Sequence, residues 1–322
     1  MELTFNMNGN KKQAVDAEKV YDVLVIGAGP AGLNAALYAK RKGMEVAVMG
    51  AKSGGQVMDT SSVENYLGIQ DATGESLVSN FLDHVKTLDI PILKDEQVRA
   101  ISKSNGVFEV NASNRLTYRG KTVILATGSK PRELGVKGES EYRGRGVAYC
   151  AICDGPLFQG MDVIVAGGGN SAVEAAIDLA KIANSVKLVH RSQLRADQIV
   201  IDKLSEFDNV SVYLETQIVE VVGEQLVKGV KVLDKKTGEE NFLGAEGIFV
   251  EIGYLPNNEL VQGLVELNDR GEVIVDSKNQ TDVEGFYAAG DVTDVPYKQI
   301  IISASEGAKA ALTANDYLNR NA

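Results

Sequence analysis

Two stretches of the chain share the same order of apolar strand, glycine-rich turn and amphipathic helix. Their turns begin at Gly27 and Gly167. The strand, turn and helix are 21–26, 27–32 and 33–42 in the first stretch, and 162–166, 167–172 and 173–182 in the second. Strands that alternate with helices in this way indicate parallel sheets made of βαβ units. The pattern predicts an α/β protein with two Rossmann-like dinucleotide-binding domains.

The same patterns predict further elements outside these two stretches. A short apolar strand is expected after each helix, at 45–49 and 186–189. Other strands are expected at 107–111, 122–126, 247–251 and 272–276, and a helix at about 304–318. Two segments rich in glycine, charge or proline, 135–146 and 253–258, are where we expect the chain to cross between domains.

Composition and charge narrow the classes of partner. The chain has 322 residues, enough for two domains, and its 33 basic against 44 acidic residues give a net charge of −11. This balance opposes nonspecific attraction to nucleic acid or anionic lipid. The first twenty residues lack the apolar core of a signal peptide, and no stretch approaches the roughly 20 apolar residues of a membrane helix. We therefore expect a cytoplasmic protein with no nucleic-acid or membrane partner.

A glycine-rich turn between a strand and a helix suits a dinucleotide. It lets the backbone approach the pyrophosphate, which then lies against free N–H groups at the positive end of the helix. One such motif is weak, but two in the correct context favour two nucleotide sites between which electrons pass. The candidate binding residues are Gly27, Gly29, Gly32, Gly167, Gly169, Asn170, Ser171 and Ala172.

The acidic residue that usually binds the ribose after the second strand is missing in both stretches. In the second stretch that strand is followed by Arg191, with Arg195 downstream. Arginine at this place favours a 2′-phosphate and hence NADPH. An ordinary solvated basic turn is the alternative interpretation.

Two further short segments are candidates for a flavin site. Asp291 follows the apolar residues 286–289, and a carboxylate at such a strand end can bond a ribityl hydroxyl or simply cap the following segment. Gly54, Gly55 and Gln56 could form part of the same site or an ordinary turn.

The two cysteines of the chain stand together, as Cys150 and Cys153. A zinc site needs about four ligands, and only His84 and His190, which we expect at the surface, could join them. Two inert buried thiols are the other alternative. The pattern favours a redox-active dithiol and no metal, with Asp154 placed to donate or accept a proton, or to cap a helix.

Together these motifs resemble low-molecular-weight thioredoxin reductases over nearly the whole chain. The resemblance rests on the first glycine motif, on 54–56, on the Cys150–Gly155 segment, on 167–172 and on Gly290-Asp291. The sequence is equally similar to the flavin-and-nucleotide portion of the alkyl hydroperoxide reductase flavoprotein, through 153–158, 170–176 and 295–302. That relative carries N-terminal thioredoxin-like domains, for which this chain has no room, so a separate redox partner is implied.

The resemblance implies an FAD-binding domain made of 20–132 and 257–322, an inserted NAD(P)H-binding domain at 133–256 that carries the dithiol, and an N-terminal extension at 1–19. Cys153 is then expected to face the flavin, Cys150 to attack the protein substrate, and Asp154 to act as the acid. FAD is expected to contact the glycines of the first turn. The nucleotide is expected to contact the second turn and the basic loop, which carries Arg191 and Arg195. The further contact residues are Gly54, Gly55, Gln56, Asn65, Asp291, Lys298, Gln299 and Ile300 for FAD, and His190, Arg191 and Arg195 for the nucleotide.

The family usually has His-Arg-Arg after the second strand, whereas this chain has His190-Arg191-Ser192, so NADH is expected as an alternative to NADPH. The leading hypothesis is a homodimeric reductase of a thioredoxin- or glutaredoxin-like protein. The alternatives are the reductase of a peroxiredoxin system, a flavin NAD(P)H oxidase, and a nucleotide-binding redox sensor without turnover.

Overall fold

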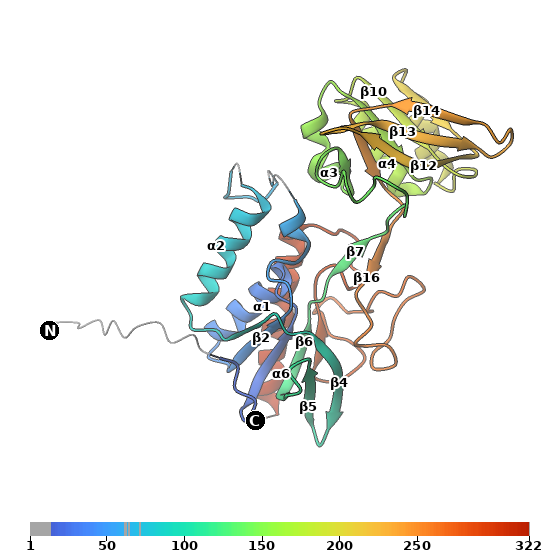
Figure 1. The fold of residues 1–322 in the computed structure, drawn as a ribbon. Helices are drawn as coiled ribbons and strands as arrows, with labels where there is room; N and C mark the ends of the chain where they lie inside the picture. The colour runs from blue at the N-terminus through green and yellow to red at the C-terminus, as the bar shows by residue number, and fades with distance from the viewer. Residues whose placement is uncertain (1–13, 61–62, 64, 71, 322) are drawn as a thin grey trace, which may run out of the picture. The chain divides into compact units, whose positions relative to one another are not determined.

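The computed structural model of the protein describes residues 14–60, 63, 65–70 and 72–321. These residues form two compact units (Figure 1). The first unit takes the described residues of Met1–Met58, Glu75–Ser129 and Pro256–Ala322, and the second those of Asp59–Gly74 and Lys130–Leu255. Two short strands, β7 (Ser129–Pro131) and β16 (Tyr254–Pro256), run where the chain passes between the units, and they pair with each other.

The first unit contains one mixed sheet in the order β3-β2-β1-β6-β5-β4, with β17 paired to β6. Its strands β1, β2, β3, β6 and β17 run parallel, while β5 is antiparallel to both β4 and β6. Their bounds are Val20–Ile26 (β1), Val46–Gly50 (β2), Ile92–Lys94 (β3), Val98–Ser104 (β4), Val107–Ala112 (β5), Thr117–Leu125 (β6) and Phe286–Ala288 (β17).

The helices of this unit are α1 (Pro30–Arg41), the 3₁₀ helix η1 (Gly55–Asp59), α2 (Gly74–Lys86) and α6 (Ile300–Arg320). Alternate residues of β1 divide the core into two layers because strand side chains alternate between faces. Val23 and Val25 pack with small residues of α1 and α6, whereas Leu24 and Ile26 pack with Phe108 on the other face.

The register of the sheet places a set of strand ends level with one another. Ile26 of β1 pairs with Met49 of β2 and Leu125 of β6, and Leu125 pairs with Ala288 of β17. The segments that follow these strands therefore lie side by side, as expected for a ligand site at the carboxyl edge of a parallel sheet.

The second unit has a parallel sheet in the order β11-β10-β9-β15-β8 and a separate antiparallel sheet in the order β12-β13-β14. The parallel strands are Val147–Ala148 (β8), Asp162–Ala166 (β9), Ser185–Val189 (β10), Val210–Tyr213 (β11) and Gly247–Val250 (β15). The antiparallel strands are Thr216–Gly223 (β12), Val227–Asp234 (β13) and Glu240–Gly244 (β14). The helices are α3 (Ala151–Asp154), η2 (Gly155–Phe158), α4 (Asn170–Ala180) and α5 (Gln198–Leu204).

In this sheet too the strand ends are level, because Ala166 pairs with both Val189 and Val250. The next residues along the chain are Gly167, His190 and Glu251, which therefore follow three neighbouring strands. The second glycine turn and the segment that begins at Glu251 therefore both lie at this edge of the sheet.

The α/β class with parallel sheets and two dinucleotide-type units is confirmed. The strand expected at 272–276 is wrong: within it only Val273 is paired, through single bridges to Leu267 and Thr293. The C-terminal helix begins at Ile300, earlier than expected. In the part of the chain that the structure describes, no helix combines the length and apolar character needed to cross a bilayer.

Candidate functional site

The first glycine turn is pressed onto the end of β6 so closely that side chains are excluded. Gly27 has φ +120, and a Cβ there would lie 2.1 Å from the carbonyl oxygen of Ala126. A Cβ on Gly32 would lie 1.9 Å from the carbonyl oxygen of Gly27. At Gly29, by contrast, the nearest atom to an added Cβ is 4.0 Å away. The turn is therefore tight against the protein at two glycines and open at the third, as a pyrophosphate needs.

The helix that follows this turn offers a suitable anion site. Gly29 is the N-cap of α1 and Pro30 is its first residue. No side chain of the described residues caps this helix, and its first turn contains no acidic residue. The first N–H groups of a helix have no intrahelical partners, and the helix dipole favours negative charge there. The residues present thus fit the diphosphate of a flavin dinucleotide.

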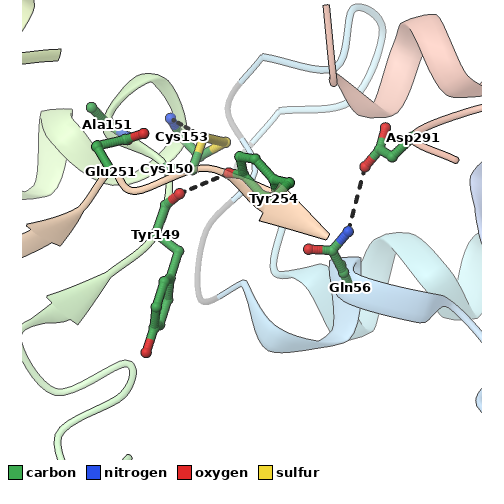
Figure 2. Close-up of a disulfide and its surroundings, with 8 residues drawn as sticks. All are labelled: Gln56, Tyr149, Cys150, Ala151, Cys153, Glu251, Tyr254 and Asp291. Atoms are coloured by element: carbon green, nitrogen blue, oxygen red, sulfur yellow. Dashed lines mark hydrogen bonds between the residues drawn. A yellow bond between two sulfur atoms is a disulfide. The ribbon is translucent and has the colours of Figure 1, made fainter. Parts of the chain in front are cut away.

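Asp291 lies just beyond β17 and follows Gly290, where an added Cβ would lie 3.0 Å from the Ala31 side chain. It accepts a hydrogen bond from the Ser303 hydroxyl at 3.0 Å and one from the Gln56 amide at 3.4 Å (Figure 2). Burial raises the pKa of Asp291, although the Ser303 hydrogen bond and the charge of Lys298 act in the opposite direction. The structure therefore brings together two predicted residues, Asp291 and Gln56, that are far apart in the sequence.

Glu306 and Gly307 of α6 support this site and were not predicted from the sequence. The side chain of Glu306 is only 3% exposed and accepts the N–H of Gly290 at 2.9 Å, which fixes the backbone just before Asp291. A Cβ on Gly307 would lie 1.9 Å from the carbonyl oxygen of Ala31, so α6 touches the first turn of α1 through bare backbone. The sequence offers only a Glu-Gly pair inside the predicted C-terminal helix as a signal.

The other residues predicted to contact FAD lie at several places. Gly54 and Gly55 both have positive φ at the start of η1, which glycine adopts without strain. Lys298 is half-buried and forms an ion pair with Glu272 at 3.2 Å, and Gln299 and Ile300 are the N-cap and first residue of α6. Asn65 is exposed and lies in the segment that groups with the second unit.

The second glycine turn encloses a histidine that we had expected at the surface. His190 is 6% exposed, and a Cβ on Gly168 would lie 2.4 Å from its ring, so the missing side chain of Gly168 makes room for the imidazole. The Ser192 hydroxyl lies 3.1 Å from its Nε2. Burial, together with the charges of Arg195 and Arg191, lowers the pKa of His190. The expectation of a surface His190 is wrong, while His84 is exposed as expected.

The basic loop is held against the same turn by its backbone. The N–H of Arg195 donates to the carbonyl of Gly168 at 2.6 Å, while the side chains of Arg191 and Arg195 are exposed to solvent. Two exposed guanidinium groups beside a glycine turn suit a phosphate. Gly169 is the N-cap of α4 and, within the described chain, receives no side-chain cap, as is true of Gly29 in the first unit.

The remaining residues predicted for this turn differ in their surroundings. Asn170 and Asp197 bond reciprocally: the Asn170 amide donates to the Asp197 carboxylate at 2.9 Å, and the Asp197 N–H donates to the Asn170 oxygen at 2.8 Å. Ser171 is exposed and Ala172 is fully buried beneath the turn. The Asn170 side chain therefore orders the loop that carries Arg195.

Cys150 and Cys153 are joined in a disulfide with Cα atoms 5.3 Å apart (Figure 2). Cys150 is the N-cap of α3, and its sulfur accepts the N–H of Cys153 at 3.2 Å. Between them, Ile152 is 65% exposed to solvent. In the described part of the chain, no group of metal-binding side chains gathers around the sulfurs or elsewhere.

The residue before Cys150 is held by several partners. The Tyr149 hydroxyl donates to Glu139 at 3.0 Å, its ring lies 4.6 Å from the Arg143 guanidinium, and its carbonyl accepts the Tyr254 hydroxyl at 2.8 Å. Burial raises the pKa of Tyr149 to about 12, so this phenol stays neutral. These contacts fix the backbone from which Cys150 projects.

Two carboxyl groups lie close to the disulfide. Asp154 follows Cys153 directly, and burial raises its pKa to about 6. Glu251, which no sequence pattern indicated, follows β15 and accepts the N–H of Ala151 at 3.1 Å (Figure 2). Its pKa is raised to about 7, mainly by burial and further by the charge of Asp154, against the effect of the Ala151 N–H. Such groups can exchange protons near neutral pH, as thiol chemistry requires.

Comparison with known proteins gives a consistent result. Residues 21–311 match the family model described as pyridine nucleotide-disulphide oxidoreductase. The F component of alkyl hydroperoxide reductase from Pseudomonas putida is 48% identical over 319 residues, which cover 98% of this chain and 61% of the relative. A Bacillus subtilis protein named NADH dehydrogenase is 46% identical over 302 residues, covering 94% of this chain and 59% of the relative.

Among solved structures, thioredoxin reductase from Streptococcus pyogenes matches with a TM-score of 0.87 and 36% identity, covering 94% of this chain and 99% of that one. The expected resemblance to both groups of enzymes is thus confirmed. The chain spans about three fifths of the length of the two curated relatives.

Proposed function

The chain belongs to the pyridine nucleotide-disulphide oxidoreductase family, and we propose that it uses NAD(P)H to reduce the disulfide of a thioredoxin-like protein through Cys150 and Cys153. The observation that carries this proposal is the Cys150–Cys153 disulfide, half-exposed and flanked by carboxyl groups that titrate near neutral pH. The cofactors of the family are FAD and a nicotinamide nucleotide.

We assign the two cofactors to the two units. FAD binds the domain formed by 20–132 and 257–322, through the first glycine turn, Gln56 and Asp291. The nucleotide binds the inserted domain at 133–256, through the second turn and the basic loop. Bound FAD supplies a carrier that accepts two electrons from the nicotinamide and passes them to the disulfide. The open face at Gly29 and the uncapped α1 support the first assignment. The second rests on the exposed guanidinium groups of Arg191 and Arg195.

The cysteines then exchange with the partner in two balanced steps. The reduced Cys150 thiolate attacks a partner sulfur and breaks the partner's S–S bond. The sulfur that leaves takes a proton, which Asp154 can donate. The Cys153 thiolate next attacks Cys150, re-forms the Cys150–Cys153 disulfide, and releases the second partner sulfur as a thiolate that takes its proton from solvent. The exposed Ile152 supports access of a partner to this segment, and the contacts of Tyr149 support a fixed backbone at Cys150.

We further propose that the protein acts in the cytoplasm as a homodimer, with a thioredoxin or a glutaredoxin-like protein as its partner. A second candidate function is the reductase of a peroxiredoxin system. The 48% identity to the F component of an alkyl hydroperoxide reductase favours this candidate. NADPH and NADH both remain in the proposal, because the loop offers exposed arginines while one curated relative is named NADH dehydrogenase.

Steady-state oxidation of NADH and of NADPH tests the proposal. Each nucleotide is supplied to the FAD-loaded protein alone, and then with a thioredoxin, a glutaredoxin, or a thioredoxin-like module with a peroxiredoxin. We expect oxidation to depend on the disulfide protein. Oxidation that depends only on oxygen would favour the flavin oxidase instead, and a protein that binds nucleotide without any turnover would be a redox sensor.

A further inference from the structure

Glu251 and Asp154 are two carboxyl groups at one disulfide, and neither has a basic partner among the described residues. Both side chains are half-buried, and no Lys, Arg or His in the described residues forms an ion pair with either of them. A carboxylate removed from water without a cation is costly, so such groups favour their protonated form. Two of them close together disfavour a second negative charge still further.

The position of Glu251 connects the glycine turn with the cysteine segment. The backbone N–H of Glu251 donates to the carbonyl oxygen of Ala166 at 2.8 Å. A Cβ added to Gly167 would lie 2.3 Å from the carbonyl oxygen of Glu251. The backbone of Glu251 is thus fixed by the sheet and by the turn. Its side chain reaches across to Ala151, the residue directly after Cys150, and accepts that N–H at 3.1 Å (Figure 2).

The charged surroundings of Glu251 are simple. Asp154 is the one charged group of the described chain that acts on its titration, and the Ala151 N–H is its one hydrogen-bond donor there. Tyr149, nearby on the segment before Cys150, stays neutral. Added negative charge on the sulfurs would therefore be felt by Glu251 and Asp154 without screening from a fixed cation.

We propose that Glu251 is a positioning residue and the second proton-holding group of the dithiol: it fixes the Cys150–Cys153 segment through Ala151 and binds a proton when the disulfide is reduced. This inference rests on the proposed function, which supplies the electrons. Two electrons break the S–S bond and leave negative charge on the two sulfurs. Solvent then supplies one proton to a sulfur and one to Glu251, so that a single thiolate remains beside the neutral carboxyl group. A protonated Glu251 offsets part of the charge that reduction creates.

Glu251→Gln tests the proposal because it removes the charge and keeps an oxygen for the Ala151 N–H. The midpoint potential of Cys150–Cys153 is measured in the FAD-loaded protein by thiol alkylation in dithiothreitol buffers from pH 6 to pH 8.5. At the acid end Glu251 is protonated, so the variant should match the wild type. At the alkaline end the variant should be easier to reduce, by about tenfold in the equilibrium constant, or ~30 mV for a two-electron couple.

Glu246→Gln is the matched control. Glu246 directly precedes β15, at its opposite end, is exposed, and also accepts a backbone N–H, from Asp162 at 2.8 Å. The midpoint potential of Cys150–Cys153 in the Glu246→Gln variant should equal that of the wild type at every pH. An equal effect of both variants, or a Glu251→Gln potential parallel to the wild type over the whole range, would overturn the proposal.

A second measurement does not depend on the folding of a variant. The infrared difference spectrum of the wild type, reduced minus oxidised, should show a positive band of protonated carboxyl near pH 7.5. Its absence would contradict proton binding by the carboxyl pair. Neither measurement uses nucleotide turnover or a protein partner, so failure of the proposed partner reaction would leave this result interpretable.

Discussion

Gly307→Ala tests the backbone contact that supports the first dinucleotide turn. A Cβ at this position would lie 1.9 Å from the carbonyl oxygen of Ala31 and 2.8 Å from the carbonyl carbon. Both atoms are backbone in the first turn of α1, so no side chain can rotate away. Real Cβ contacts are essentially never shorter than 3.0 Å, so α1 and α6 would have to separate by more than about 1 Å.

The size and sign of the effect follow from two opposing contributions. Alanine favours a helix over glycine by about 1 kcal/mol. Overpacking a close contact costs about 1–3 kcal/mol, and backbone on both sides places this site at the upper end. We therefore expect Gly307→Ala to lower the free energy of unfolding by about 2 kcal/mol. The same shift moves Ala31, next to the open face at Gly29, so we also expect FAD to be lost more easily.

Guanidinium unfolding and the flavin absorbance per chain measure the two effects. Ser305→Ala is the control, since Ser305 is exposed on the same helix and the substitution should change stability by only a few tenths of a kcal/mol. A Gly307→Ala protein that is about 1 kcal/mol more stable than the wild type, with full FAD content, would show that helix propensity dominates and that the close approach is not required.

Three further predictions concern the dithiol and the nucleotide. Cys150→Ser and Cys153→Ser should each abolish reduction of a protein disulfide while leaving flavin reduction by NAD(P)H intact in rapid-mixing spectra, because one thiol cannot complete the exchange. Asp154→Asn should raise the free energy of unfolding above pH 6 by up to ~3 kcal/mol and not below pH 3.8. Burial raises this pKa from 3.8 to about 6, so above pH 6 the native wild type holds a buried negative charge that Asn removes, whereas below pH 3.8 the carboxyl group is neutral in both the native and the unfolded state. Denaturant titrations above pH 6 and below pH 3.8 measure the difference. Arg191→Ala should raise the KM for NADPH about 10- to 100-fold, with little change in the KM for NADH or in kcat, because a charged hydrogen bond to the 2′-phosphate is lost. Equal effects on both nucleotides would show that Arg191 does not bind the 2′-phosphate.

The sequence by itself determined the features that depend on neighbours along the chain. The two glycine turns, the helices after them and the Cys150–Cys153 pair are all local patterns, because strand period, turn conformation and helix period involve only a few successive residues. These patterns were sufficient for the α/β class and for a disulfide oxidoreductase. The strand expected at 272–276 failed because its apolar alternation found no partner strand beyond the bridges of Val273.

The tertiary structure decided which residues surround those local features. Glu251 reaches Ala151 across 100 residues of sequence, and Glu306 reaches Gly290 from the next helix. His190 is buried because Gly168 has no side chain, which no periodicity in either segment indicates. Burial and long-range hydrogen bonds depend on how strands align and helices pack, and these set the pKa of each carboxyl group beside the disulfide.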